Sequence, residues 1–227
     1  MERHPTSSEA SLARGSASGD PAWIAADLRA EDYTVRLAPE EREAIARAIA
    51  TDEPWHAFTR SQVPAECAAL WDRVRGCLDE RAGFCVVSGF PFEAGEEHAA
   101  DRARRITFLA GYGLGTPVFQ DAQGGRLVDI SSTDANMSDA ISYAPRADGT
   151  HVRPYETRAA FRLHADACDV AGLFCVQSAA RGGSSSIVNA LTVYRRLSEA
   201  RPDLLEVLQQ PFYYAKPRKP GEPPSYH

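Results

Sequence analysis

One short segment, Leu163-His164-Ala165-Asp166, places a histidine and a carboxylate two residues apart. On a β-strand, residues i and i+2 point to the same face, so these two side chains would converge without distortion of the backbone. An imidazole and a carboxylate belong to the 2-His-1-carboxylate triad, which binds Fe(II) and leaves positions open for substrate and oxygen. The segment therefore predicts part of an iron site. The alternative is a helix or loop in which the two side chains diverge, with His164 an ordinary hydrogen-bonded histidine.

The residues that follow Asp166 give this pair a context. An apolar run is followed by a Gly-Gly turn with serines, a β-branched run, and a helical stretch that contains Arg-Pro-Asp-Leu-Leu; these are Leu173–Val176, Gly182–Asn189 and Arg201–Leu205. This order resembles the TauD/TfdA-like (clavaminate synthase-like) Fe(II)/2-oxoglutarate-dependent dioxygenases. The resemblance covers about residues 21–227 and is most specific over 161–212.

The resemblance implies roles for three residues. His164 and Asp166 match the first two iron ligands, and Ser185 matches the hydroxyl residue that helps to hold the carboxylate of 2-oxoglutarate. A hydroxyl can donate to a carboxylate, and adjacent glycines let the backbone approach closely. The alternative for Ser185 is a turn residue in a serine-rich loop. The implied activity consumes O2 and 2-oxoglutarate with Fe(II), oxidises a small organic substrate, usually by hydroxylation, and releases succinate and CO2.

The family pattern continues with a distal histidine and an arginine that pairs with the far carboxylate of 2-oxoglutarate. His227 is the one histidine after Asp166, and no arginine follows Arg218. We therefore expect a dioxygenase that is truncated at its C-terminus, with a third ligand from His227, water or a second chain. The alternative is a catalytically incomplete relative that acts as a binding or interaction protein.

Helices are expected in the first half of the chain. Proline suits the first helical position, which predicts a helix from Pro39. An apolar stripe at helical spacing predicts a second helix after Pro64, which ends at Gly83; its members are Cys67, Leu70, Trp71, Val74 and Leu78. A third helix is expected over His98–Leu109. It should end there, because the glycine-rich run that follows disfavours a helix.

Short strands are expected around and after these helices. A buried strand is predicted at Phe84–Val87, and others at 127–130, 161–163, 173–176 and 187–188, followed by a helical stretch over Thr192–Gln209 that is broken near Pro202. Together with the resemblance, this order predicts an α+β fold: a double-stranded β-helix (jelly-roll) with N-terminal helices, in which the C-terminal part of the barrel is missing. Residues 1–20 are expected to be a disordered leader, and residues 21–227 an incomplete dioxygenase domain.

Composition narrows the possible partners. The net charge of −6 argues against a nucleic-acid-binding protein, and no stretch is apolar enough to span a membrane. Five cysteines without CxxC spacing fit a reducing cytoplasm. The expected partners are a small-molecule substrate and a second copy of the chain in a homo-oligomer that covers the incomplete sheet.

Overall fold

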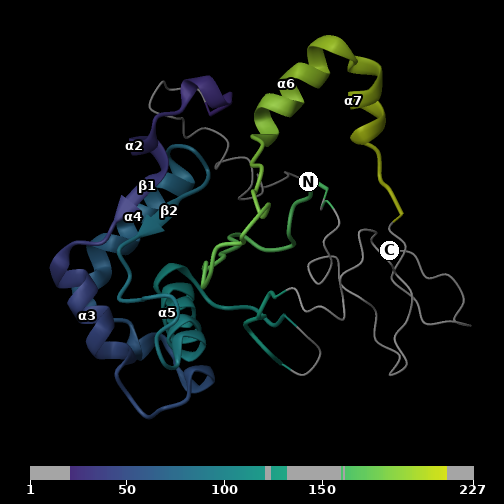
Figure 1. The fold of residues 1–227 in the computed structure, drawn as a ribbon. Coiled ribbons are helices and arrows are strands. Elements are labelled where there is room, and N and C mark those ends of the chain that lie inside the picture. Colours follow the sequence, from purple (N-terminus) through teal and green to yellow (C-terminus); the bar gives the residue numbers. More distant parts are fainter. Residues whose placement is uncertain (1–20, 121–123, 132–159, 161, 214–227) are drawn as a thin grey trace, which may run out of the picture. The chain divides into compact units, whose positions relative to one another are not determined.

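Residues 21–120, 124–131, 160 and 162–213 are described by a computed structural model (Figure 1). Contacts between residues divide the chain into two units. The first comprises Met1–Leu127 and Asp166–Val193, and the second comprises Val128–Ala165 and Tyr194–His227. The leader expected at 1–20 lies outside the described residues. No helix among the described residues is long and apolar enough to cross a membrane.

Three helices form the main part of the first unit: α3 (Pro39–Ile49), α4 (Ala68–Asp79) and α5 (Ala99–Leu114). Shorter helical turns precede and join them: η1 (Ala25–Asp27), α2 (Ala30–Tyr33), η2 (Trp55–Ala57), η3 (Arg60–Gln62) and η4 (Ala65–Cys67). Pro39 opens α3 as predicted, and Glu41 Oε2 accepts a hydrogen bond of 2.8 Å from the backbone N–H of Ala38. That contact satisfies one of the N–H groups that a helix start leaves without a partner.

A two-stranded parallel sheet joins these helices. Strand β1 (Thr34–Arg36) pairs with β2 (Val86–Ser88), with Val35 opposite Val87. A strand is thus confirmed here, although it begins two residues and ends one residue later than the predicted Phe84–Val87. The prediction that this strand is buried is wrong, because Val86 is 51% exposed. The rings of Trp23 and Tyr33 contact Phe84 just before the strand. Strand β1 was not predicted. Its signal is the alternation of exposed Thr34 and Arg36 with buried Val35 and Leu37.

The core of the first unit lies between the three helices and the sheet. Four members of the apolar stripe predicted after Pro64 are buried in it, whereas Leu78 is half-buried, and α4 ends at Asp79 instead of the predicted Gly83. The largest fully buried side chains are Phe58, Ile45, Leu70, Ile106 and Leu109. At the edge of this core, both oxygens of the Glu41 carboxylate accept hydrogen bonds from Arg73, at 2.9 and 2.8 Å. This pairing holds the pKa of Glu41 below its ordinary value, against the opposing effect of burial.

Helix α5 is longer than the sequence indicates. The prediction ended it at Leu109 because of the glycines that follow, whereas the helix continues through Gly111 and Gly113 to Leu114. The reason is tertiary packing. A Cβ atom on Gly113 would lie 2.4 Å from Cε2 of Trp71, so only glycine allows α5 to approach α4 so closely. The favourable contact outweighs the weak helix propensity of glycine.

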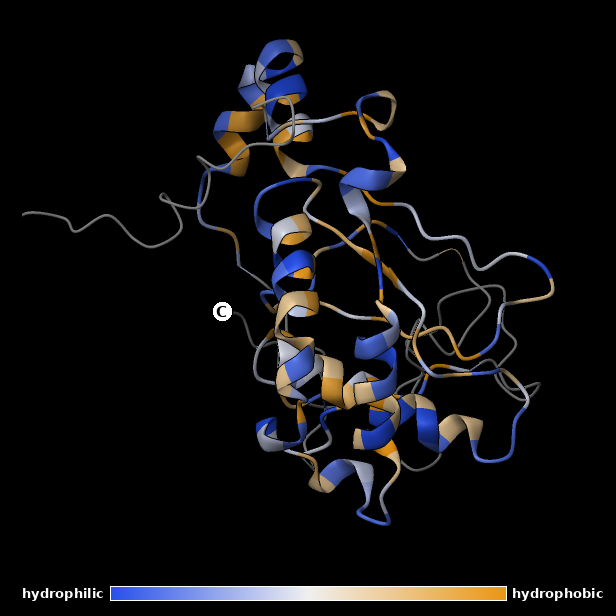
Figure 2. Cartoon of the chain, turned by 90° about the vertical axis from the view of Figure 1, so that its left-hand side faces the viewer, coloured by the Kyte–Doolittle hydropathy of each residue, from blue (hydrophilic) through white to orange (hydrophobic). Residues whose placement is uncertain are grey.

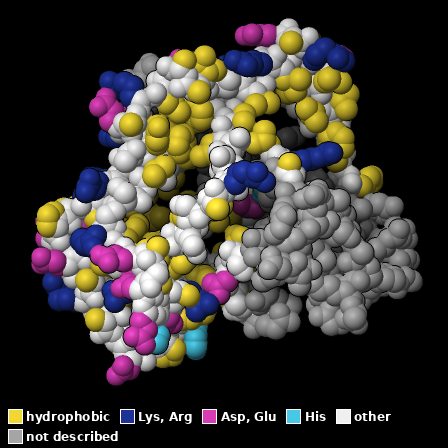
Figure 3. All heavy atoms as spheres, in the orientation of Figure 1, with side chains coloured by type: hydrophobic (Ala, Val, Ile, Leu, Met, Phe, Trp, Pro, Cys, Tyr) yellow, Lys and Arg dark blue, Asp and Glu magenta, His cyan; other side chains and the backbone are white. Residues whose placement is uncertain are grey.

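The strands predicted for the second half are wrong for the residues that the structure describes. Residues 127–130, 162–163, 173–176 and 187–188 have no strand structure, and the apolar side chains among them are mostly exposed. Figure 2 shows hydrophobic (orange) stretches in parts of the ribbon that are neither helix nor strand, and Figure 3 shows hydrophobic side chains on the face in view. Phe161 lies outside the described residues. A strand is stabilised by hydrogen bonds to a neighbouring strand, so apolar alternation alone does not produce a sheet. The helical prediction near the end is confirmed, as α6 (Ala190–Ala200) and α7 (Pro202–Leu208) separated at Arg201.

Candidate metal centre

His164 lies in a segment of the second unit that is neither helix nor strand, and its side chain is exposed. Its Nδ1 atom lies 2.8 Å from the backbone carbonyl oxygen of Arg162. A carbonyl oxygen can only accept a hydrogen bond, so Nδ1 must carry the hydrogen. In the neutral imidazole, Nε2 is then the nitrogen with the lone pair. A histidine that binds a metal through one nitrogen commonly donates the hydrogen of the other to a backbone carbonyl or carboxylate, which fixes the ring.

Asp166 is the first residue of the second segment of the first unit, Asp166–Val193. Its side chain is exposed as well. The boundary between the two units falls between Ala165 and Asp166. The strand expected here is absent from residues 162–166, so the convergence of the two side chains through strand geometry stays a prediction from the spacing.

Ser185 follows a turn in the first unit. Gly182 and Gly183 have φ angles of +81° and +74°, a backbone region that side chains other than glycine rarely enter. A Cβ atom on Gly183 would also lie 3.2 Å from the Cβ of Ala179. These contacts and angles favour glycine at both positions, directly after the bend at Ala180 and Arg181. Ser185 is exposed in a stretch without helix or strand that follows the two glycines, and its role toward 2-oxoglutarate stays a prediction.

A complete triad of protein ligands is not assembled within the part of the chain that the structure describes. No group of three or more His, Cys, Asp or Glu side chains comes close enough there to hold a metal ion. His227, the one histidine after Asp166, lies outside the described residues. Of the residues that the sequence predicts for this site, the structure therefore describes His164, Asp166 and Ser185.

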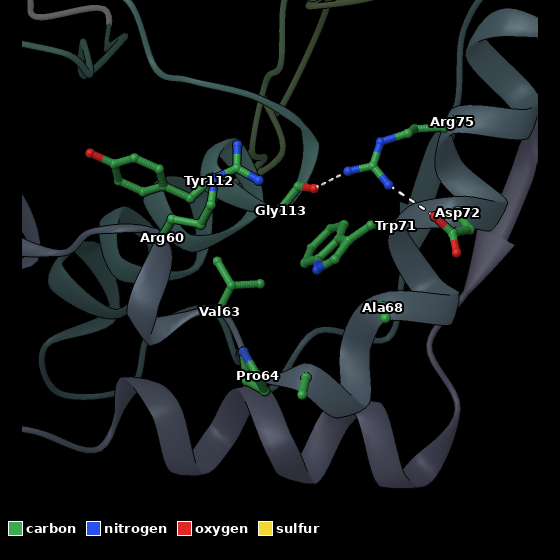
Figure 4. Close-up of a pocket in the computed structure, with 10 residues that line it drawn as sticks. Arg60, Val63, Pro64, Ala68, Trp71, Asp72, Arg75, Tyr112 and Gly113 are labelled. Atoms are coloured by element: carbon green, nitrogen blue, oxygen red, sulfur yellow. Dashed lines mark hydrogen bonds and ion pairs between the residues drawn. The ribbon is translucent and has the colours of Figure 1, made fainter.

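The first unit also contains an open pocket of about 270 Å³ at the C-terminal end of α5 (Figure 4). Two arginines reach this end from other elements: Arg75 donates to the carbonyl of Gly113 at 2.5 Å, and Arg60 donates to that of Gly115 at 2.6 Å. They satisfy helix carbonyls that would otherwise lack partners. The indole of Trp71 packs beside Gly113, and its buried Nε1 finds no acceptor among the described groups.

Neither Arg60 nor Arg75 is a candidate site residue from the sequence. Each arginine reaches its carbonyl across 38 or more residues of chain, and no local spacing signals such a contact. The contacts complete the end of α5, so we assign these arginines a structural role.

Comparison with known proteins places the chain in a family. Residues 38–227 match the family described as taurine catabolism dioxygenase TauD, TfdA family. The chain is also similar to FR-33289 synthase from Streptomyces rubellomurinus, with 28% identity over 172 residues, which cover 74% of this chain and 47% of that protein. The chain therefore spans about half the length of this curated relative. No solved structure matched the chain significantly.

Proposed function

Because the chain belongs to the taurine catabolism dioxygenase TauD, TfdA family, we propose that it contributes the proximal part of a non-haem Fe(II)/2-oxoglutarate-dependent dioxygenase site. The proposed ligands are His164 through Nε2 and Asp166 through its carboxylate. Ser185 would donate to a carboxylate of 2-oxoglutarate. The substrate class that we propose is a small organic molecule, oxidised most simply by hydroxylation, with succinate and CO2 as the other products.

The observation that carries the proposal is the contact between His164 Nδ1 and the carbonyl oxygen of Arg162. It selects the tautomer whose Nε2 can donate its lone pair to a metal. Imidazole and carboxylate together suit Fe(II), and the i, i+2 spacing allows both to face one ion when the segment is extended. Bound Fe(II) and 2-oxoglutarate would supply the oxidising chemistry, while the protein supplies the ligands and the orientation of the substrate.

An anaerobic titration with Fe(II) and 2-oxoglutarate tests the proposal. Chelation of 2-oxoglutarate by protein-bound Fe(II) gives a visible metal-to-ligand charge-transfer band, which we expect from the wild-type chain and not from His164→Ala or Asp166→Asn. The matched control is Asp169→Asn, which removes an exposed carboxylate three residues further on and should keep the band. A band of equal strength in His164→Ala would overturn the assignment of the ligands.

The same titration tests Ser185. Ser185→Ala should weaken the binding of 2-oxoglutarate by about 10- to 100-fold, the loss expected for one hydrogen bond to a charged carboxylate. Ser184→Ala removes a neighbouring hydroxyl and should leave the affinity unchanged. If the two variants behave alike, Ser185 is a turn residue and the hydroxyl contact to the cosubstrate is wrong.

A second candidate function is binding without turnover. It is motivated by the described residues, which bring no third protein ligand to the pair. A catalytically incomplete relative should bind Fe(II) weakly and form no succinate, and it would act as a binding or interaction module. Succinate formation that depends on Fe(II) and on His164 would exclude this candidate. If a second copy of the chain supplies the third ligand, the charge-transfer band should instead depend on the protein concentration.

A further inference from the structure

The segment Asp166–Val193 carries two of the proposed site residues, Asp166 and Ser185, and has no helix or strand before α6 begins at Ala190. We propose that two contacts fasten this segment to the helical core and thereby position Asp166 and Ser185. One contact is the ring of Phe174, and the other is the pair of side chains Asn189 and Thr192. The roles of Asp166 and Ser185 rest on the proposed function; the two contacts do not.

Phe174 is the first fastening. Across residues 162–188, all of them described, it is the one side chain that is not exposed. Its ring meets those of Phe90 and Phe92 edge to face, with centroids 5.8 and 5.1 Å apart, and so packs against the core of the first unit. The preceding residue, Leu173, is 82% exposed. The contrast between these two neighbours identifies a specific anchor in an otherwise exposed segment.

The second fastening consists of two long-range hydrogen bonds at the start of α6. Asn189 Nδ2 donates to the carbonyl of Pro21 at 2.9 Å, and Thr192 Oγ1 donates to that of Trp23 at 2.7 Å. Trp23 is itself held by a bond of 2.9 Å from its Nε1 to the carbonyl of Ala82. These bonds join parts of the chain about 168 residues apart, so they attach α6 to the N-terminal residues of the first unit.

Asn189 also caps α6, because its Oδ1 accepts a hydrogen bond of 2.9 Å from the backbone N–H of Thr192. The side-chain amide of Asn189 thus makes two separate contacts: its oxygen caps the N-terminus of α6, and its nitrogen attaches the helix to Pro21. This division allows the attachment to be removed while the cap is kept.

In the sequence, Ser185 lies between the two fastenings, and both fastenings follow Asp166. A segment without helix or ladder hydrogen bonds can adopt many conformations, and each fixed point removes part of that freedom. A ligand that is fixed in advance loses less entropy when the metal binds. Phe174 and Thr192 are therefore positioning residues: they act on the site through the segment and not by contact with metal or cosubstrate.

The first test is limited proteolysis of the full chain by trypsin at Arg181, an exposed residue between the two fastenings. We expect Phe174→Ala to raise the rate of cleavage after Arg181 by about three- to tenfold, as expected for the loss of an aromatic contact. Leu173→Ala is the matched control and should change the rate by less than about twofold. Phe174→Tyr keeps the ring and should restore the wild-type rate. Equal rates for Phe174→Ala and Leu173→Ala would overturn the first fastening.

The second fastening is tested by replacements that keep the shape of the side chain. Asn189→Asp preserves the oxygen that caps α6 and removes the donor to Pro21. Thr192→Val removes the hydroxyl, and Thr192→Ser retains it. We expect Asn189→Asp and Thr192→Val to raise the cleavage rate by about two- to tenfold and Thr192→Ser to stay near wild type. The helix signal in circular dichroism should be unchanged in all three; cleavage rates equal to wild type would overturn this fastening.

The third measurement links the fastenings to the proposed site. The Fe(II) affinity, from the charge-transfer band with 2-oxoglutarate, should fall by about three- to tenfold in Phe174→Ala and recover in Phe174→Tyr. Faster cleavage with unchanged Fe(II) affinity would show that the segment is fastened but that the fastening does not position the ligand, which overturns the proposal. If the wild-type chain gives no band, the proposed function fails, and the cleavage rates still decide whether the segment is fastened.

Discussion

The helical part of the first unit and the described residues 162–213 differ in how they use their apolar side chains. The former buries Ile45, Leu70 and Ile106 to 1% exposure or less, whereas residues 162–213 contain no buried residue. The helices satisfy their own backbone hydrogen bonds and need only an apolar stripe to pack. The later residues have strand-like composition, and strands need partners. The proposed chemistry therefore lies in the region that has no core of its own and depends on attachment to the region that has one.

The largest expected effect comes from making the same substitution, leucine to alanine, in the helical part of the first unit and in residues 162–213. Leu70→Ala removes a fully buried side chain and should lower the free energy of unfolding by about 2–5 kcal/mol. Leu173→Ala removes an 82% exposed side chain and should change it by no more than about 0.5 kcal/mol. Urea denaturation followed by tryptophan fluorescence measures both. A loss above about 1 kcal/mol for Leu173→Ala would show that the later region is buried in solution.

Glycines provide a comparison inside the helical region, with effects of opposite sign. Gly113→Ala would push a Cβ into the ring of Trp71 and should destabilise the protein by about 1–3 kcal/mol. Gly76→Ala lies in helix α4, where an added Cβ meets nothing within 4 Å, and should stabilise it by about 0.4–1 kcal/mol. Melting temperatures of the two variants should move in opposite directions. A stable Gly113→Ala protein would mean that α4 and α5 can separate at little cost.

The sequence predicted the parts of the fold that depend on local patterns. Pro39, the stripe of α4 and the break near Pro202 each follow from propensity and periodicity over a few residues. Gly113 was misinterpreted because its reason is the ring of Trp71, 42 positions earlier, which no local pattern reveals. The strands near Leu173 and Ile187 were predicted from composition, yet strand formation depends on pairing. For the candidate site, the residue types and spacing of His164 and Asp166 were available from the sequence, whereas the contact that selects the tautomer of His164 came from the structure.

A smaller effect is expected for the ion pair at the edge of the core, and it should depend on pH. The pKa of Glu41 is lowered, chiefly by the hydrogen bonds from Arg73, so its stabilising contribution is complete above the pKa of an unfolded glutamate. The contribution is lost as the pH falls through the lower pKa of the folded state. Glu41→Gln should cost about 1–2 kcal/mol at pH 7, with the difference from wild type vanishing in acid. Glu40→Gln, which replaces an exposed neighbour in the same helical turn, is the control and should change the free energy of unfolding at pH 7 by no more than about 0.5 kcal/mol.

The least perturbing comparison uses the five cysteines and changes no residue. Cys67 and Cys77 are buried in the helical region, whereas Cys168 and Cys175 are exposed in the later segment, and none of the five forms a disulfide. Burial raises the pKa of the Cys67 thiol to about 11, and burial together with the neighbouring Cys77 raises that of Cys85 to about 12. Because the thiolate is the reactive form, an aromatic disulfide reagent at pH 8 should label the two exposed thiols quickly. The other three should react only after unfolding. Rapid labelling of Cys77 would mean that the helical core opens readily. Slow labelling of both Cys168 and Cys175 would mean that the later segment is covered in solution. A homo-oligomer that shields this region would produce that second result.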